Sequence, residues 1–203
     1  MLLLELFKGT GSFSKVADEF NMKVISVDID PKMLPTILTD ILEWDYKSIP
    51  VPDFITASPP CETFSCLIIT HRNKVRDYFG DMRPLNKKGE LGDAILFKTI
   101  EIIKYFLQLN PNLKFSIENP RGFMRKMKCM EEFILHTILY SHYGFPYHKP
   151  TNFWSNIPLN VIQYKDEPRK KLNDVMLNYS LKDRYRIPPD LCRDILLSFF
   201  PTF

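Results

Sequence analysis

The stretch LLLELFKGTGSFSKVADEFNMKVISVDID, residues 2–30, joins an apolar run, a glycine pair, a helical pattern and a second apolar run that ends on acidic residues. Leu2–Phe7 predicts a buried strand, and Gly9 and Gly11 predict a tight loop directly after it. Apolar residues then recur at helical spacing, and Lys23–Val27 predicts the next strand. A strand, a loop, a helix and a strand in this order predict a parallel β-α-β unit.

Further along the chain, apolar runs with strand character alternate with runs of helical spacing. Asp53–Ala57 and Leu113–Ile117 predict two more strands, and Gly92–Leu109 has the clearest helical face. Met130–Tyr143 and Pro188–Phe199 predict two further helices. Strands that alternate with helices indicate an α/β fold with a mainly parallel sheet and helices on both faces.

Composition and charge narrow the class of protein. The 203 residues are 45% hydrophobic, so we expect a single domain over residues 1–203. The net charge of +3 is compatible with a polyanionic partner without requiring one. The four cysteines form no CxxC pair and no histidine lies at ligand spacing, so we expect free thiols and no metal site. No signal-peptide pattern or bilayer-length apolar run is present, so we expect a soluble intracellular protein of the cytoplasm, nucleoid or nucleus without membrane contact.

Four residues that can carry chemistry follow predicted strand ends, namely Gly9, Asp28, Cys61 and Glu118. Because the carboxyl ends of parallel strands share one edge of the sheet, we expect these residues to converge there. The glycines let a ligand approach the backbone, and a carboxylate about 20 residues later can accept hydrogen bonds from ribose hydroxyls. These features favour a nucleoside-containing cofactor. A plain tight turn at the glycines and a capping role for Asp28 are the alternatives.

Cys61 lies in SPPCETFS, residues 58–65, where two prolines precede a single thiol. A nucleophilic cysteine must reach the thiolate state, which nearby backbone N–H groups favour. The alternative is a buried structural cysteine, which is the role that we expect for Cys66. Glu118, in the tripeptide ENP of residues 118–120, is either an acid that hydrogen-bonds the edge of a base or part of a turn.

Together, these segments resemble the motifs of the DNA (cytosine-5) methyltransferase family. LFKGTGSF resembles the family's cofactor loop, SVDID its ribose-binding acid strand, and DILEW its adenine-contacting Asp-Ile pair. SPPCETFS resembles the Pro-Cys nucleophile motif and ENP the Glu-Asn motif. The order and spacing agree over residues 2–120, with weaker similarity at YGFPYHKPTNFW and RIPPDLCRDIL. The resemblance implies the Rossmann-like fold of S-adenosylmethionine-dependent methyltransferases, with S-adenosylmethionine as the cofactor.

The resemblance also implies a role for each matching residue. Cys61 would add to carbon 6 of a cytosine, Glu118 would protonate or hydrogen-bond ring nitrogen 3, and carbon 5 would take the methyl group. Asn119 would hold the Glu-Asn motif in place, Pro60 would aim the nucleophile, and the target base would leave the stack. The implied cofactor contacts are Phe7, Gly9, Thr10, Gly11, Ser12, Phe13, Asp28, Ile29, Asp40, Ile41 and Pro60. The implied substrate contacts are Ser65, Arg72, Lys74 and Lys149.

The chain departs from the family pattern in its motifs and in its size. Glu62 stands where the family has Gln, and Pro120 where it has Val. The family's Gln-x-Arg-x-Arg segment aligns with residues 147–151, of which only Lys149 keeps a positive charge. The interval from Asn156 to Arg184 is too short for the target-recognition domain that the family inserts there. Specificity would then come from a short loop or a partner subunit, or be largely absent.

Two polar segments rich in positive charge predict loops, His71–Lys88 and Lys165–Lys171. The first follows the nucleophile motif, and its six Lys and Arg residues fit either phosphate contacts or a solvated loop. We expect DNA as the substrate, with RNA as the alternative. Two other functions stay open. One is exocyclic amino methylation, whose Pro-Pro motif carries an aromatic residue where Cys61 stands, and the other is a catalytically impaired subunit that binds cofactor or nucleic acid.

Overall fold

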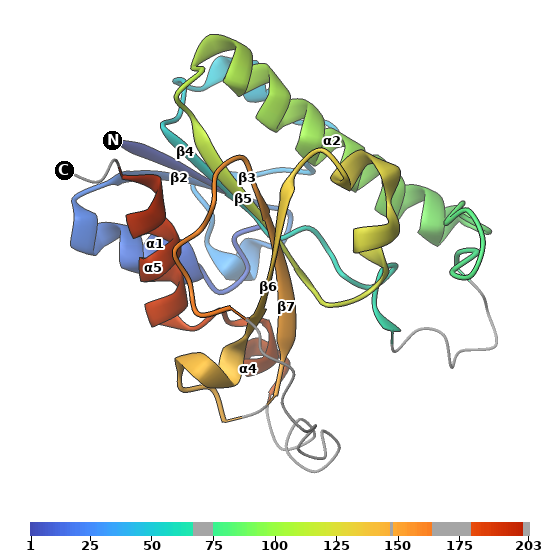
Figure 1. Cartoon of the computed structure of the whole chain (residues 1–203). Coiled ribbons are helices and arrows are strands. Elements are labelled where there is room, and N and C mark those ends of the chain that lie inside the picture. Colours follow the sequence, from blue (N-terminus) through green and yellow to red (C-terminus); the bar gives the residue numbers. More distant parts are fainter. Residues whose placement is uncertain (67–74, 147, 164–179, 201–203) are drawn as a thin grey trace.

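The computed structural model describes residues 1–66, 75–146, 148–163 and 180–200. These residues form a seven-stranded sheet in the order β3-β2-β1-β4-β5-β7-β6, with helices on both faces (Figure 1). The strands are β1 (Leu2–Leu6), β2 (Lys23–Asp28), β3 (Ile37–Leu38), β4 (Phe54–Ala57), β5 (Lys114–Pro120), β6 (Ile134–Leu139) and β7 (Pro150–Ser155). The α-helices are α1 (Ser12–Ala17), α2 (Lys87–Leu109), α4 (Leu181–Tyr185) and α5 (Pro189–Phe199). The 3-10 helices are η1 (Asp18–Phe20), η2 (Pro31–Met33), η3 (Tyr46–Ser48), η5 (Phe123–Lys126), η6 (Lys128–Met130) and η7 (Tyr140–Tyr143).

The sheet is mainly parallel, as the sequence predicts. Neighbouring strands from β3 through β5 run parallel, whereas β7 runs antiparallel to both β5 and β6. From β1 the chain moves outward through β2 to β3, and from β4 it moves the other way through β5. The order therefore reverses between β1 and β4. In open α/β sheets the crevice at such a reversal, outside the carboxyl ends of the strands, is where ligands bind.

Each face of the sheet carries its own hydrophobic core. Side chains alternate between the faces of a strand, so Leu4 and Leu6 of β1 pack on one side and Leu3 on the other. Helix α2 covers the first face with residues such as Leu96 and Ile103. Helices α1 and α5 cover the second face (Figure 1). The strands between these layers are buried from both sides, which explains their nearly continuous apolar sequences.

Two sequence predictions about these elements are wrong. Met130–Tyr143 is not a helix, because Ile134–Leu139 forms β6 and pairs along its whole length with β7. Glu118–Pro120 is not a turn after a strand but the last part of β5. The parallel neighbour β4 ends opposite Ile117, and antiparallel β7 extends the strand by pairing with the following three residues. Lys165–Lys171 lies outside the described residues.

A local hydrogen bond sets the start of helix α2. The helix begins at Lys87, earlier than the predicted Gly92, because the Asn86 side chain accepts a hydrogen bond from the Gly89 N–H at 3.0 Å. Such an N-cap satisfies a backbone donor that has no partner within the helix.

Within the described ranges, no helix combines the length and apolar composition needed to cross a membrane.

We expect the burial of α2 against the sheet to dominate its contribution to stability. Leu96→Ala removes a side chain that is 0% exposed, and should lower the free energy of unfolding by about 2–5 kcal/mol. Leu91→Ala, on the same helix at 51% exposure, should change it by about 0.5 kcal/mol or less. Urea denaturation followed by circular dichroism measures both. Equal losses in the two variants would contradict the assignment of the buried face.

Candidate active site

The glycine loop after β1 is held in an uncommon backbone conformation. Phe7, Gly9 and Gly11 all have positive φ, at 58°, 47° and 66°. Glycine adopts this region freely, but a phenylalanine there is strained and persists only where its surroundings impose it. The Gly9 N–H donates to Asp28 Oδ2 at 2.8 Å, which ties the loop to the end of β2. Gly9 and Asp28 therefore meet at the reversal point, where the sequence places them.

Glu5 of β1 holds this loop through hydrogen bonds to the start of α1. The sequence patterns did not identify this residue. Its carboxylate is buried and accepts hydrogen bonds from the N–H groups of Phe13 and Ser14, at 3.1 and 3.3 Å, and from the Ser14 hydroxyl. Burial raises the pKa of Glu5, and these hydrogen bonds oppose that shift. The available signal was a lone acid in an otherwise apolar strand directly before the glycines.

The hydroxyl groups of the glycine loop form hydrogen bonds within the protein. Ser12 Oγ accepts a hydrogen bond from the Ile187 N–H at 3.1 Å and lies 3.0 Å from Thr10 Oγ1. These bonds connect the loop to the segment before α5. The Phe13 side chain is buried in the core between α1 and α5. Only the backbone N–H of Phe13 helps to hold the loop, through its hydrogen bond to Glu5.

The acids and apolar residues expected around a nucleoside differ in exposure. Asp28 is partly exposed, and its Oδ1 accepts the Asp30 N–H at 2.9 Å. Ile29, the next residue in the sequence, is 65% exposed. Asp40 accepts the Leu42 N–H at 2.9 Å, whereas Ile41 is buried in the core under α2.

Cys61 follows β4 at the opening of a tight turn. Its carbonyl oxygen accepts hydrogen bonds from the N–H groups of Phe64 and Ser65, at 2.9 and 3.0 Å. The Asn119 side-chain amide donates to the Pro59 carbonyl oxygen at 2.9 Å, so the end of β5 holds the loop that carries Cys61. Pro60, between them, is exposed.

Glu118 is 8% exposed and accepts hydrogen bonds from the Tyr140 hydroxyl, at 3.3 Å, and from the Ser58 side chain. Burial raises the pKa of the Glu118 carboxyl, so its protonated form is favoured relative to a solvated glutamate. The positive charge of Lys149 acts in the opposite direction. Glu118 is thus a buried acid that, within the described part of the chain, is influenced by one cation, Lys149.

The thiol of Cys61 is half-buried and belongs to the same electrostatic group. Burial raises its pKa, the Glu118 charge raises it further, and Lys149 lowers it. Removal from water lowers the pKa of Lys149, while Glu118 and Cys61 raise it. Lys149 interacts with both Glu118 and Cys61, and Glu118 also acts on Cys61, so the structure brings together a thiol, a carboxyl and an ammonium group from three separate segments.

Lys149 is positioned by residues from other elements. Its Nζ donates to the Arg184 carbonyl oxygen at 2.8 Å and lies 4.8 Å from the centre of the Tyr140 ring. Tyr140 therefore contacts both Lys149 and Glu118. No local pattern identified Tyr140, because its place beside Glu118 depends on the path of the chain directly after β6, within the segment that was wrongly predicted as a helix.

The expectation for Cys66 is wrong. Cys66 is exposed, and its Sγ lies 3.8 Å from the Arg121 carbonyl oxygen. Cys192 of α5 is the fully buried cysteine instead. Ser65 is half-buried beside the Cys61 turn. Arg72 and Lys74 lie outside the described residues, so their role as substrate contacts stays a prediction.

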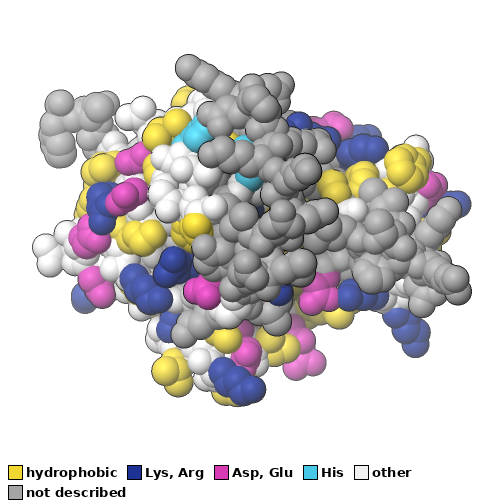
Figure 2. Space-filling view, turned by 90° about the horizontal axis from the view of Figure 1, so that it is seen from below, with side chains coloured by type: hydrophobic (Ala, Val, Ile, Leu, Met, Phe, Trp, Pro, Cys, Tyr) yellow, Lys and Arg dark blue, Asp and Glu magenta, His cyan; other side chains and the backbone are white. Residues whose placement is uncertain are grey.

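The face of the molecule seen from below carries charges of both signs. In the view from below, Lys and Arg side chains alternate with Asp and Glu over the described part of the molecule and do not merge into one field (Figure 2). No group of three or more potential metal ligands occurs among the described residues.

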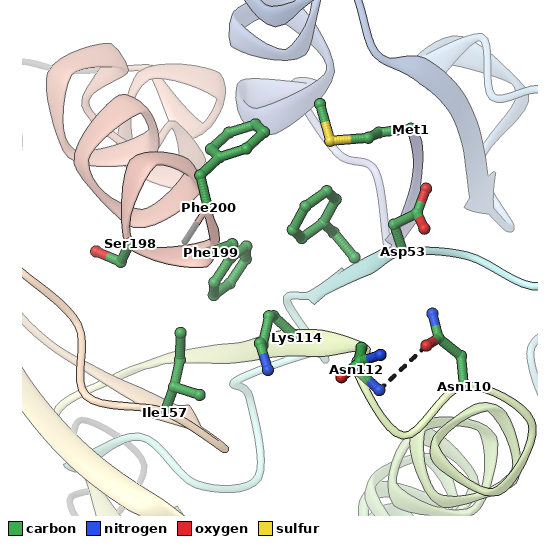
Figure 3. Close-up of a pocket in the computed structure, with 10 residues that line it drawn as sticks. Met1, Asp53, Asn110, Asn112, Lys114, Ile157, Ser198, Phe199 and Phe200 are labelled. Atoms are coloured by element: carbon green, nitrogen blue, oxygen red, sulfur yellow. Dashed lines mark hydrogen bonds between the residues drawn. The ribbon is translucent and has the colours of Figure 1, made fainter. Parts of the chain in front are cut away.

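A separate hollow of about 570 Å³ lies at the amino ends of β1, β4 and β5, beside Met1, Asp53 and Lys114 (Figure 3). It is at the opposite edge of the sheet from Cys61.

Comparisons with known proteins agree with this architecture. No protein-family model and no curated protein matches the chain. Among solved structures, the Entamoeba histolytica methyltransferase EhMeth matches with a TM-score of 0.51 and 16% identity, over 84% of this chain and 57% of that one. Schizosaccharomyces pombe Dnmt2 methyltransferase matches at 0.48 and 18%, over 78% and 52%, and a Spodoptera frugiperda DNMT2 mutant at 0.47 and 18%, over 81% and 53%. The chain thus spans little more than half the length of these proteins.

The match to EhMeth, at this low identity, bears on the fold alone. Together with the strand order and the reversed strand β7, it confirms the predicted fold. The chain has the Rossmann-like fold of methyltransferases.

We expect Lys149 to control how readily Cys61 ionises. Lys149→Met removes the positive charge that lowers the pKa of the thiol, so the thiolate fraction at a fixed pH falls. Alkylation of Cys61 by iodoacetamide should become roughly tenfold slower at pH 8, with its pH profile displaced upward. Mass spectrometry of the modified peptide, in a Cys66→Ser background, gives the rate at Cys61 alone.

Lys23→Met is the matched control, because Lys23 is exposed at the amino end of β2, at the edge of the sheet away from Cys61. Its alkylation profile should equal that of the parent chain. A Lys149→Met profile that also equals the parent would show that this charge does not reach the thiol.

Proposed function

We propose that this chain is an S-adenosylmethionine-dependent DNA cytosine-5 methyltransferase with Cys61 as its covalent nucleophile. The observation that carries the proposal is the convergence of Cys61 and Glu118, which the Asn119–Pro59 hydrogen bond holds together. A thiol and a buried acid at the ligand-binding edge of a methyltransferase fold are the two groups that the motif resemblance assigns to this reaction. The finer assignment to DNA rests on that resemblance.

The residues at the reversal point fit the nucleoside part of S-adenosylmethionine. A Cβ placed on Gly9 would meet only the Phe7 carbonyl oxygen within 4 Å, at 3.8 Å, so the loop leaves open space beside its backbone. Each Asp28 oxygen accepts one backbone N–H and keeps a lone pair for a ribose hydroxyl. Ile29 offers an exposed apolar surface for the adenine. When bound, the cofactor supplies an electrophilic methyl group on a sulfonium.

In the proposed reaction, the side chains of this chain prepare the cytosine to accept that methyl group. The Cys61 thiolate forms a bond to carbon 6, and the electron pair of the 5,6 double bond moves toward carbon 5. Glu118 donates a proton or hydrogen bond to ring nitrogen 3, which its burial-raised pKa favours. After carbon 5 has been methylated, a water molecule takes its proton, the C5–H electron pair restores the 5,6 double bond, and the C6–S bond breaks to release the Cys61 thiolate. Covalent catalysis of this kind divides one difficult substitution into easier steps.

Lys149 has a supporting role in this scheme. It is the cation that stabilises both the Cys61 thiolate and the Glu118 carboxylate. Because both groups lie away from water, their interaction with the ammonium is weakly screened. We therefore assign to Lys149 part of the support that the resembling family obtains from its Gln-x-Arg-x-Arg segment.

Target selection requires groups beyond the reacting residues. The chain has no space between Asn156 and Arg184 for a recognition domain of its own. We propose that selection of a DNA sequence comes from a partner subunit or from short loops.

Covalent trapping tests the nucleophile. Double-stranded DNA that carries 5-fluorocytosine should form a stable adduct with the parent chain in the presence of S-adenosylmethionine, because fluorine cannot leave as a proton does. Cys61→Ser should form none, and Cys66→Ser should form as much as the parent. Denaturing gel electrophoresis with labelled DNA measures the adduct. Retained trapping in Cys61→Ser would overturn the assignment of the nucleophile.

A methyl-transfer assay tests the substrate and product. The purified chain with labelled S-adenosylmethionine should convert cytosine to 5-methylcytosine in double-stranded DNA, as identified by nucleoside mass spectrometry. Transfer to transfer RNA alone would replace DNA by RNA as the substrate. A product methylated on an exocyclic nitrogen would contradict the role of Cys61. Binding of cofactor and DNA without transfer would indicate a catalytically impaired subunit.

A further inference from the structure

Arg76 is a fully buried arginine that the proposed reaction does not use. Its side chain is 0% exposed and lies in a loop that follows the Cys61 turn. A buried guanidinium is costly unless its donors and its charge are satisfied. The partners of Arg76 therefore indicate what this residue holds in place.

The guanidinium joins three segments of the chain. Its Nε and Nη2 donate to the carbonyl oxygen and hydroxyl of Thr63, at 3.1 and 3.3 Å, in the turn that begins at Cys61. Nη2 also donates to the Gly89 carbonyl oxygen at 3.0 Å, and Nη1 to that of Met82 at 3.2 Å. Nη1 forms an ion pair with Asp93 Oδ1 at 2.6 Å. The guanidinium thus makes four hydrogen bonds to three residues, and the ion pair with Asp93 balances its charge.

The flat face of the guanidinium also contacts the Cys61 turn. It lies 4.3 Å from the centre of the Phe64 ring, within the range of a cation–π interaction. The Tyr78 hydroxyl adds a second donor to the Thr63 carbonyl oxygen at 3.2 Å. Thr63 is thus held through its backbone carbonyl and its hydroxyl, and Phe64 is held through its ring.

Helix α2 and the segment after β5 close the space around the same turn. A Cβ added to Gly92 would lie 2.2 Å from Thr63 Oγ1, and one added to Gly122 would lie 2.3 Å from the Phe64 carbonyl oxygen. The Phe123 N–H donates to that carbonyl oxygen at 2.7 Å. The turn is therefore packed between the helix and the segment that follows Glu118. Two charged groups connect it to the helix layer: the buried Arg76, and the exposed Lys88 of α2, which pairs with Glu62 at 2.6 Å.

We infer that Arg76 is a positioning residue for Cys61, acting through Thr63 to hold the thiol at the fixed place from which it faces Glu118. The inference rests on the proposed function for its catalytic consequence, but the geometric coupling of Arg76 to Cys61 is independent of it. Lysine cannot replace the residue fully, because an ammonium lacks the planar fork that reaches Thr63, Gly89 and Met82 together.

The test measures the reactivity of Cys61 without substrate. In a Cys66→Ser background, Arg76→Met should free the turn, expose the thiol to water and raise its iodoacetamide alkylation rate about tenfold at pH 8. The pH profile should move down toward that of a free thiol, because the pKa of the held thiol is raised by burial. Arg76→Lys should give an intermediate profile. Arg83→Met, an exposed arginine of the same loop, should leave the profile unchanged.

Thr63→Val provides a milder variant if Arg76→Met fails to fold, because it removes only the hydroxyl acceptor of the network. It should displace the Cys61 profile in the same direction, with the cofactor affinity by calorimetry unchanged. In the methyl-transfer assay, kcat of Arg76→Lys should fall about 100-fold with the KM for cofactor unaltered, because small misplacements of a reacting atom have effects of this size.

The outcomes separate the two proposals. A Cys61 alkylation profile that is identical to the parent in Arg76→Lys and Thr63→Val would overturn the positioning role, whatever the methyl-transfer assay shows. Displaced profiles together with a parent chain that transfers no methyl group would support the positioning role and refute the proposed function.

Discussion

The hydrogen bond from the Asn119 amide to the Pro59 carbonyl oxygen is the contact on which the candidate site depends. It joins the last residues of β5 to the loop after β4, and so sets Glu118 and Cys61 relative to one another. Asn119 and Pro59 are both buried, and a carbonyl left without a partner there would cost about 1–3 kcal/mol. On the far side of the same loop, Arg76 fastens the turn after Cys61 to helix α2. The thiol is therefore held from the sheet and from the helix layer.

Burial defines the electrostatic character of this site. It raises the pKa of both the Cys61 thiol and the Glu118 carboxyl, so each is favoured in its protonated form. A protonated Glu118 is a hydrogen-bond donor, whereas the thiol must lose its proton to attack. Lys149, inserted from the segment before β7, lowers the pKa of both groups. In the resting state the Cys61 thiol and the Glu118 carboxyl are favoured in their protonated forms, so little charge is buried. In the reactive state Cys61 is a thiolate, and the Lys149 ammonium stabilises its negative charge.

Much of the fold could be predicted from local sequence. The runs that form β1, β2 and β4 are short and apolar, as in strands covered on both faces, and the spacing in α2 and α5 is plainly helical. The segment Met130–Tyr143 misled the prediction because Met130, Ile134 and Ile138 also recur at helical spacing. Pairing with the next strand, β7, decided its conformation, and the partner residues lie well beyond the three or four positions that helical spacing samples. The same neighbour extended β5 through Glu118, which local turn signals had ended.

The sequence by itself determined the strand-loop-helix-strand unit, the glycine loop and the order of the residues at the strand ends. Each of these follows from short-range patterns, since chain geometry brings the carboxyl ends of parallel strands to one edge. Only the tertiary structure decided which buried groups support them. Glu5, Tyr140 and Arg76 act through contacts with distant segments, and Cys66 proved exposed while Cys192 was buried. No local pattern encodes these outcomes, because burial and hydrogen-bond partners depend on how the layers pack.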